Sequence, residues 1–268
     1  MLEKIQETAE YLKMRIPTSP ATGIILGTGL GNLVTQLTET TEIPYETIPN
    51  FPVSTVEGHS GKLIIGKLGG KDGLAMQGRF HYYEGYDMKQ VTFPVRVMHA
   101  LGIRTLLVSN ASGGMNPDFE IGDLMLITDH INLFPEHPLR GKNHKELGTR
   151  FPDMSEAYSK ELLEKAREIA RRNSIRVVEG VYVGTTGPTF ETPAEYRYFR
   201  IIGGDAVGMS TVPEVIVASH AGMKVFGISI ITDLGVPGKI VEVTHEEVQE
   251  IGNKVQPLMT QIMMEMVE

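Results

Sequence analysis

The sequence predicts an α/β fold: a single three-layer domain over residues 1–268, with helices on both sides of a central sheet. Short apolar strand patterns alternate with amphipathic helix patterns from one end to the other, and neither an internal repeat nor a linker-like segment divides the chain. A chain of 268 residues is also long enough to bury roughly three quarters of the surface it exposes when unfolded.

The first elements are a helix and three strands. Apolar residues spaced by three and four predict a helix over residues 2–16, which Pro17 ends. A buried strand over 23–26 runs into the cluster Gly27-Thr28-Gly29-Leu30-Gly31, and residues 32–60 show no sustained periodicity, as in loops and short strands. The sheet resumes in two further strand patterns, at 62–66 and 73–76.

The middle of the chain has a second junction between a strand and a glycine cluster. A helix is predicted over 93–101, closed by Gly102, and a buried strand over 105–109 leads into Asn110-Ala111-Ser112-Gly113-Gly114. Another strand is predicted over 124–128. Residues 129–153 hold three prolines and are predicted to be a long irregular excursion, either a plain surface loop or an element that serves function or an interface.

The last third of the chain again alternates between helix and strand patterns. Residues 159–173 form an amphipathic helix pattern with a Glu161 to Lys165 pair, and Arg171-Arg172 is typical of a cation-rich last helical turn rather than a basic binding patch. Strands are predicted over 177–183 and 224–232. Thr192-Pro193-Ala194-Glu195 begins a capped helix between them, and Thr244-His245-Glu246-Glu247 begins a final helix that Pro257 should kink.

Composition excludes several classes of function. Lys and Arg number 25 against 33 Asp and Glu, and a net charge of −8 argues against nucleic acids or an anionic membrane surface as partners. The absence of Cys excludes disulfides, thiolate zinc sites, iron–sulfur clusters and a cysteine nucleophile. The apolar stretches are shorter than the ~20 residues of a membrane span. The amphipathic N-terminus differs from a signal peptide, so we expect a cytoplasmic protein.

Three strand ends carry groups suited to an anion. Backbone N–H groups around Thr28 could cradle a phosphate, although a structural tight turn is an equal alternative because the third glycine of G-x-G-x-x-G and a Walker lysine are missing. Arg79 and His81 would clamp an oxyanion, unless Arg79 only pairs with Glu84. With the backbone at Ala111, these groups should meet at the carboxyl ends of the strands. No metal site is expected, and His130, His137 and His144 are spaced by chance.

A further segment suits a purine ring. In Gly187-Pro188-Thr189-Phe190-Glu191-Thr192, Phe190 offers an apolar face and Glu191 a carboxylate that accepts from ring N–H groups. The alternative is that Glu191 only complements the dipole of the helix that follows.

Six ordered segments that span essentially the whole chain resemble the trimeric purine nucleoside phosphorylase family. They are Gly27-Thr28-Gly29-Leu30-Gly31, Gly58-His59-Ser60-Gly61, Gln77-Gly78-Arg79-Phe80-His81-Tyr82-Tyr83-Glu84-Gly85, Asn110-Ala111-Ser112-Gly113-Gly114, Gly187-Pro188-Thr189-Phe190-Glu191-Thr192 and Gly208-Met209-Ser210-Thr211-Val212-Pro213-Glu214. Any one of these could be coincidence, but the ordered series is specific.

The resemblance implies a mixed, partly barrel-like sheet, a homotrimer, and phosphorolysis of purine nucleosides to the base and a pentose 1-phosphate, with no metal or organic cofactor. Carried over by motif, the catalytic set is His81, Glu191, Asp233 and His245. Phosphate would be held by Thr28, His59, Arg79, His81, Ala111 and Ser210. Ribose would be framed by Tyr83, Met209 and His245, and the purine by Phe190, Glu191, Val207 and Asp233.

Three positions depart from the family pattern. Thr28 replaces a usual Ser and keeps the hydroxyl, and Leu147 replaces an aromatic residue that often reaches a neighbouring subunit's site. Asp233 replaces the Asn of 6-oxopurine-specific members. Either burial keeps Asp233 protonated, or its carboxylate accepts from a 6-amino group, so we expect activity on inosine and guanosine with adenosine better accepted than by Asn-bearing relatives.

The alternatives are of three kinds. Asp233 would suit a methylthioadenosine phosphorylase, whereas Glu191 argues against one. A dinucleotide-binding protein would explain the first glycine cluster but leave the segments around Arg79, Glu191 and Met209 without a role. A nucleoside-binding module without catalytic activity would keep the pocket alone.

Overall fold

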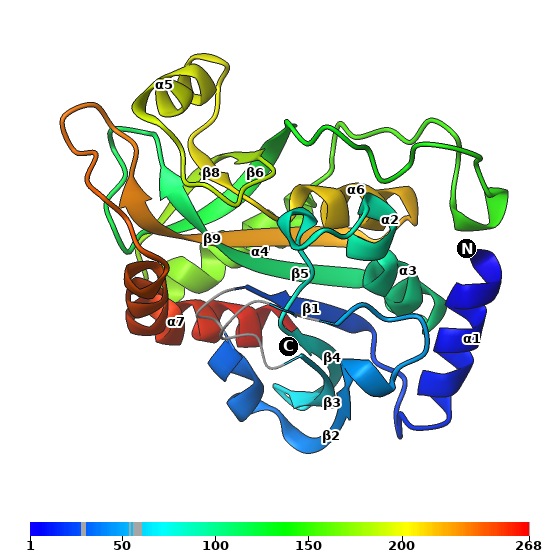
Figure 1. The fold of residues 1–268 in the computed structure, drawn as a ribbon. Helices are drawn as coiled ribbons and strands as arrows, with labels where there is room; N and C mark the ends of the chain where they lie inside the picture. The colour runs from blue at the N-terminus through cyan, green and yellow to red at the C-terminus, as the bar shows by residue number, and fades with distance from the viewer. Residues whose placement is uncertain (28–30, 54, 56–60, 268) are drawn as a thin grey trace.

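A mixed sheet forms the centre of the protein in the computed structural model, which describes residues 1–27, 31–53, 55 and 61–267 (Figure 1). Within these residues the strand order is β2-β3-β4-β1-β5-β8-β7-β6-β9, and β5 also pairs with β9, so the last five strands of this order close on themselves. The strands are β1 Thr22–Leu26, β2 Thr38–Pro44, β3 Lys62–Leu68, β4 Lys71–Gln77, β5 Thr105–Gly114, β6 Leu124–Asn132, β7 Val177–Gly184, β8 Ala206–Gly208 and β9 Lys224–Leu234.

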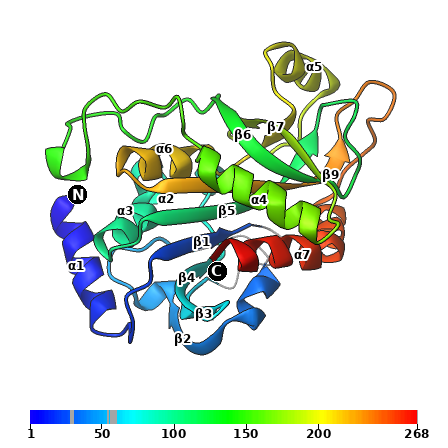
Figure 2. The same cartoon turned by 180° about the vertical axis from the view of Figure 1, so that it is seen from behind.

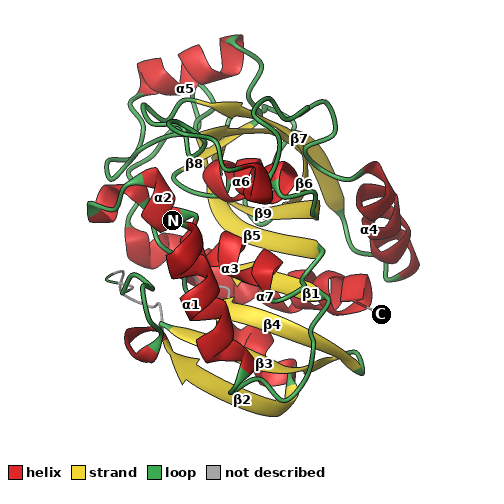
Figure 3. Ribbon diagram, turned by 90° about the vertical axis from the view of Figure 1, so that its right-hand side faces the viewer, coloured by secondary structure: helices red, strands yellow, loops and turns green. Residues whose placement is uncertain are grey.

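Helices cover both sides of this sheet. The α-helices are α1 Leu2–Lys13, α2 Met88–Val91, α3 Phe93–Ala100, α4 Lys160–Arg172, α5 Pro193–Ile201, α6 Val212–His220 and α7 His245–Val267. Short 3-10 turns cover Gly31–Gln36, Tyr45–Thr47, Tyr82–Glu84 and Lys145–Leu147. Helices α2, α3 and α6 lie on the side seen in Figure 1, whereas α4 packs beside α7 on the opposite side (Figure 2). The side view shows the curved sheet between these groups (Figure 3). The predicted layered α/β fold is therefore confirmed.

The second glycine cluster lies inside a strand and not beyond one. We expected the strand to end at Ser109, but β5 continues to Gly114, and residues 110–114 pair with β9. The register shifts between Ser112 and Gly113, a β-bulge that re-aims the end of the strand. In the same way β6 runs to Asn132, so the irregular excursion begins after residue 132 and not at 129.

The expected Glu161 to Lys165 pair is wrong. The carboxylate of Glu161 lies 2.6 Å from Nζ of Lys224, at the start of β9, and Nζ of Lys165 donates to the carbonyl oxygen of Met266 at 3.0 Å. Arg172 pairs with Glu265 of α7. The charged side of α4 meets β9 and α7, and these tertiary partners replace the pair within the helix.

Both predicted helix caps are present. The hydroxyl of Thr192 accepts from the backbone N–H of Glu195 at 3.2 Å, and Thr244 accepts from that of Glu247 at the same distance. Helix α7 runs through Pro257 as one helix of 23 residues. No helix in the described residues is long and apolar enough to cross a membrane.

Candidate active site

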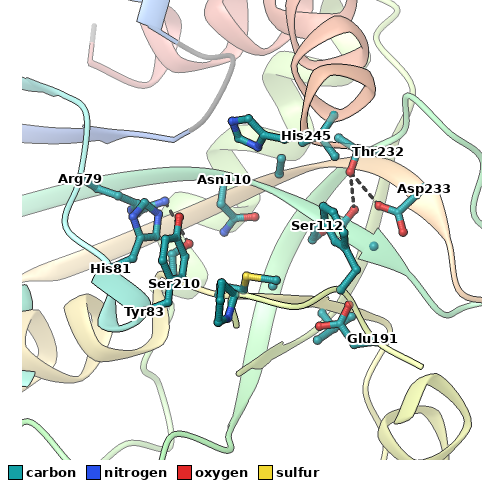
Figure 4. A pocket seen from close by; sticks show the side chains of 18 of the residues that line it. Arg79, His81, Tyr83, Asn110, Ser112, Glu191, Ser210, Thr232, Asp233 and His245 are labelled. Carbon is teal, nitrogen blue, oxygen red and sulfur yellow. Dashed lines mark hydrogen bonds between the residues drawn. The ribbon is translucent and has the colours of Figure 1, made fainter. Parts of the chain in front are cut away.

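A cavity of about 510 Å³ opens where the ends of β5, β8 and β9 meet the segment after β4, the loop before α5 and the first turn of α7 (Figure 4). It brings together most of the residues that the sequence predicts for the site: Arg79, His81, Tyr83, Ala111, Phe190, Glu191, Val207, Met209, Ser210, Asp233 and His245. The remaining two, Thr28 and His59, lie outside the described residues.

One end of the cavity is built around Arg79, of which only 1% is exposed. Its Nε and Nη2 atoms lie 3.2 and 2.7 Å from the two carboxylate oxygens of Glu214, in the first turn of α6. Nη1 donates to the carbonyl oxygen of Ser109 at 2.8 Å and to Oγ of Ser210 at 3.2 Å. The guanidinium is therefore held rigidly with its charge beside Ser210.

His81 is the next group along this end, and it takes the partner that we had considered for Arg79. Its Nδ1 lies 2.9 Å from Oε1 of Glu84, so the alternative of an Arg79–Glu84 pair is wrong. Burial lowers the pKa of His81, against the opposing effect of Glu84. Burial alone would raise the pKa of Glu84, but hydrogen bonds from His81 and Thr55 lower it to about 2.

The ionised state of Glu84 and the lowered pKa of His81 determine which nitrogen of the His81 ring carries the hydrogen. An ionised carboxylate only accepts, so Nδ1 of His81 carries the hydrogen, and in the neutral ring Nε2 is then an acceptor. Such a nitrogen can accept a hydrogen bond, whereas an oxyanion clamp at this position calls for a donor. Tyr83 stacks on this ring, with centroids 4.6 Å apart and planes inclined by 15°.

Asn110 completes this end, and no sequence pattern distinguishes its side chain from its neighbours. Its Nδ2 donates to Oγ1 of Thr211 at 2.8 Å, whereas the buried Oδ1 has no hydrogen-bond partner among the described residues. Thr211 has a positive φ of 71°, which is uncommon for a residue other than glycine. Strain of this kind is typical of functional sites, and here it turns the chain from Ser210 into α6.

The other end of the cavity carries two carboxyl groups (Figure 4). Oδ1 of Asp233 accepts from the hydroxyl of Thr232 at 3.0 Å, and Oδ2 accepts from that of Tyr196 at 3.1 Å. Burial raises the pKa of Asp233. Burial, with the nearby charge of Asp233, also raises the pKa of Glu191, to about 7. Phe190 and Val207 add apolar surface, and Phe190 is 42% exposed. This end can therefore take a flat ring with polar edges.

Met209 and His245 lie between the two ends. Gly187 has a φ of 60°, and a Cβ placed there would lie 2.3 Å from Sδ of Met209, so only glycine fits against this side chain. His245 is the first residue of α7, and its Nε2 lies 3.0 Å from Nε2 of Gln249. Within the described residues, no three His, Cys, Asp or Glu side chains cluster as metal ligands would.

The chain that forms this cavity is similar to known proteins over most of its length. A family model described as the phosphorylase superfamily matches residues 21–268. Purine nucleoside phosphorylase 1 of Geobacillus stearothermophilus is 58% identical over 94% of this chain and 92% of that protein. The Bos taurus purine nucleoside phosphorylase is 50% identical over 94% and 90%. The chain belongs to the purine nucleoside phosphorylase family.

Solved structures of this family agree with the fold. The Schistosoma mansoni purine nucleoside phosphorylase in complex with adenosine has a TM-score of 0.95 and 41% identity, and the match covers 100% of this chain and 97% of that one. A schistosoma purine nucleoside phosphorylase in complex with hypoxanthine gives the same TM-score, identity and coverage. The mixed, partly barrel-like sheet and the transfer of a pentosyl group from a purine nucleoside to phosphate are thereby confirmed. The dinucleotide-binding and non-catalytic alternatives are wrong.

Proposed function

We propose that this chain cleaves inosine and guanosine, as ribo- and 2′-deoxyribonucleosides, reversibly with inorganic phosphate, and that it also accepts adenosine through Asp233. The observation that carries the proposal is the polarity of this cavity, with Arg79 and His81 at one end and Glu191 with Asp233 at the other. A related phosphorylase whose structure holds adenosine supports the adenosine activity.

Each end of the cavity has a role in this proposal. Phosphate binds to Thr28, His59, Arg79, His81, Ala111 and Ser210. The pentose lies against Tyr83, Met209 and His245, with His245 toward its 5′-hydroxyl. The purine packs between Phe190 and Val207 and bonds to Glu191 and Asp233. Phosphate is the co-substrate, and neither a metal nor an organic cofactor takes part.

The chemistry follows from this placement. The glycosidic bond breaks as its electron pair moves onto the purine, and a phosphate oxygen bonds to the anomeric carbon of the oxocarbenium-like sugar. Phosphate is a poor nucleophile and the purine a poor leaving group, so catalysis is mainly positioning and electrostatics. Arg79 and His81 hold the anion beneath the sugar, where its charge also stabilises the cation. A proton donor at N7 stabilises the departing base. Asp233 supplies it to a 6-oxopurine in its protonated form, and in its ionised form it accepts from the 6-amino group of adenosine.

Product release measured with and without phosphate tests the proposal. Inosine, guanosine, adenosine and methylthioadenosine are incubated with the protein, and base and sugar phosphate are quantified. We expect base only when phosphate is present, and no loss of activity with a chelator. Base without phosphate would indicate a hydrolase. Preferential turnover of methylthioadenosine would favour a methylthioadenosine phosphorylase, for which Asp233 is the supporting residue.

We also propose that residues 1–268 form a single domain and that the protein is a cytoplasmic homotrimer. In the described structure Leu147 packs partly buried against its own core, and its carbonyl oxygen accepts from Nη1 of Arg96 at 3.2 Å. We propose that the neighbouring segment of the 133–153 excursion reaches an adjacent subunit. Light scattering of the purified protein gives the number of subunits.

A further inference from the structure

Tyr196 joins the two carboxyl groups at the base end of the cavity. It lies on the buried side of α5 and is only 4% exposed. Its hydroxyl donates to Oδ2 of Asp233 at 3.1 Å and is also within hydrogen-bonding reach of the Glu191 carboxyl. The carboxyl groups line the cavity and Tyr196 stands behind them, so it would act on a substrate through them.

Two glycines shape the slot that holds this tyrosine. A Cβ on Gly235 would lie 2.2 Å from Cδ1 of the Tyr196 ring. A Cβ on Gly113 would lie 2.8 Å from Oδ2 of Asp233 and 3.3 Å from the Tyr196 hydroxyl oxygen. Any larger residue at either position would displace the ring or the hydrogen bond. The backbone on two sides is therefore built around the Tyr196–Asp233 contact.

The hydroxyl is a constant donor. Burial and the charges of Asp233 and Glu191 raise the pKa of Tyr196 well above its usual value, so the phenol stays protonated. The one hydroxyl hydrogen of Thr232 is shared between Oδ1 of Asp233 at 3.0 Å and the carbonyl oxygen of Ser112 at 3.3 Å, and Tyr196 donates to Oδ2. Both bonds favour the ionised carboxyl, whereas burial favours the neutral one. The titratable groups around this pair are Glu191, Glu195 beyond it, and His245 across the cavity.

We propose that Tyr196 is a specificity-determining positioning residue, whose hydroxyl shifts Asp233 toward its hydrogen-bond-accepting form and so raises the turnover of 6-amino relative to 6-oxopurine nucleosides. The inference rests on the proposed function. An acceptor carboxylate binds the hydrogens of a 6-amino group and repels O6. Without the hydroxyl, burial leaves Asp233 protonated, and a protonated carboxyl donates to O6 or N7.

The test compares kcat/KM for adenosine and inosine in Tyr196→Phe and in the wild type. We expect the adenosine-to-inosine ratio to fall about tenfold, the effect of one hydrogen bond to a charged group. Tyr198→Phe is the matched control, because Tyr198 is on the same helix and 53% exposed. It should leave the ratio unchanged. In an Asp233→Asn background, Tyr196→Phe should no longer change the ratio.

The pH profile separates this role from a merely structural one. In Tyr196→Phe the adenosine-to-inosine ratio of kcat/KM should change at a higher pH than in the wild type. A loosened fold would instead lower the activities on adenosine and inosine together. A ratio in Tyr196→Phe equal to that of the wild type overturns the inference. If the wild type releases no base from either nucleoside in the presence of phosphate, the proposed function fails instead, and the two failures are thus distinguishable.

Discussion

Arg79 and Glu214 are 135 residues apart in the chain and form a two-pronged ion pair in the interior, with N–O distances of 3.2 and 2.7 Å. Their side chains are 1% and 4% exposed. The pair ties the segment after β4 to the first turn of α6 and holds the guanidinium beside Ser210. Because water cannot replace either partner, this contact joins the stability of the fold to the geometry of the anion end.

Glu214→Gln should therefore lower both stability and phosphate binding. It leaves a buried guanidinium without its counter-charge, which costs about 3–5 kcal/mol. Chemical unfolding measures this, and KM for phosphate should rise about tenfold or more as Arg79 loses its orientation. Glu42→Gln is the control, because the Glu42–Lys62 pair is 51% and 41% exposed and should contribute at most about 1 kcal/mol. Equal losses in the two variants would contradict the role given to Glu214.

Glu84 should make the stability of the fold depend on pH in the acidic range. Its carboxyl has a pKa of about 2 in the fold against an ordinary 4.5, so the ionised native form adds stability above pH 4.5 that is lost as pH falls toward 2. Glu84→Gln removes this contribution. The difference in unfolding free energy between wild type and variant should therefore narrow by roughly 2 kcal/mol from pH 7 to pH 3. Parallel stability curves for the two proteins would show that Glu84 is not held in this way.

The groups at the strand ends could be predicted from the sequence because their signals are local. A strand pattern followed by glycines, or by Arg79 and His81 two residues apart, places anion-binding groups at one edge of the sheet. The resemblance then added Asp233 and His245, which local patterns alone do not distinguish. Helix α6 was missed because eight of its nine residues are buried, so it has no polar side to give a helical period.

Contacts between distant segments could not be predicted. Glu214 follows Arg79 by 135 residues, and no spacing rule relates them. Tyr196 looks like an ordinary core residue of an amphipathic helix, and its contact with Asp233 arises only when α5 folds against the end of β9. In both contacts, the partner of a buried ionisable side chain comes from a distant segment, so only the tertiary structure brings the two together.

Gly235 should tolerate no side chain. Gly235→Ala would drive a Cβ into the ring of Tyr196, at 2.2 Å, and the displaced ring would release Asp233. We expect a loss of about 1–3 kcal/mol in stability and a fall in base binding. Gly73→Ala is the control, because the nearest atom to its Cβ is a backbone oxygen at 3.9 Å. Calorimetry should show a lower Tm for Gly235→Ala alone, and a Tm equal to that of Gly73→Ala would refute the close packing.

Glu191 should make substrate preference depend on pH near neutrality. Burial raises its pKa to about 7, so the carboxyl is mainly neutral at pH 6 and mainly ionised at pH 8. The ionised form accepts from N1–H of inosine, whereas the neutral form donates to the bare N1 of adenosine. The inosine-to-adenosine ratio of kcat/KM should therefore rise between pH 6 and pH 8, and a ratio taken at equal phosphate cancels the titration of phosphate itself.

Glu191→Gln should remove most of this rise, since an amide does not titrate. Stability gives an independent readout: a carboxyl whose pKa is higher in the fold than in the unfolded chain stabilises the native state at low pH, and that stability is lost as pH rises from about 4.5 to about 7. The wild type should therefore lose stability relative to Glu191→Gln over this interval and run parallel to it above pH 8. A substrate ratio that still rises in Glu191→Gln to the same extent would assign the titration to Asp233 instead.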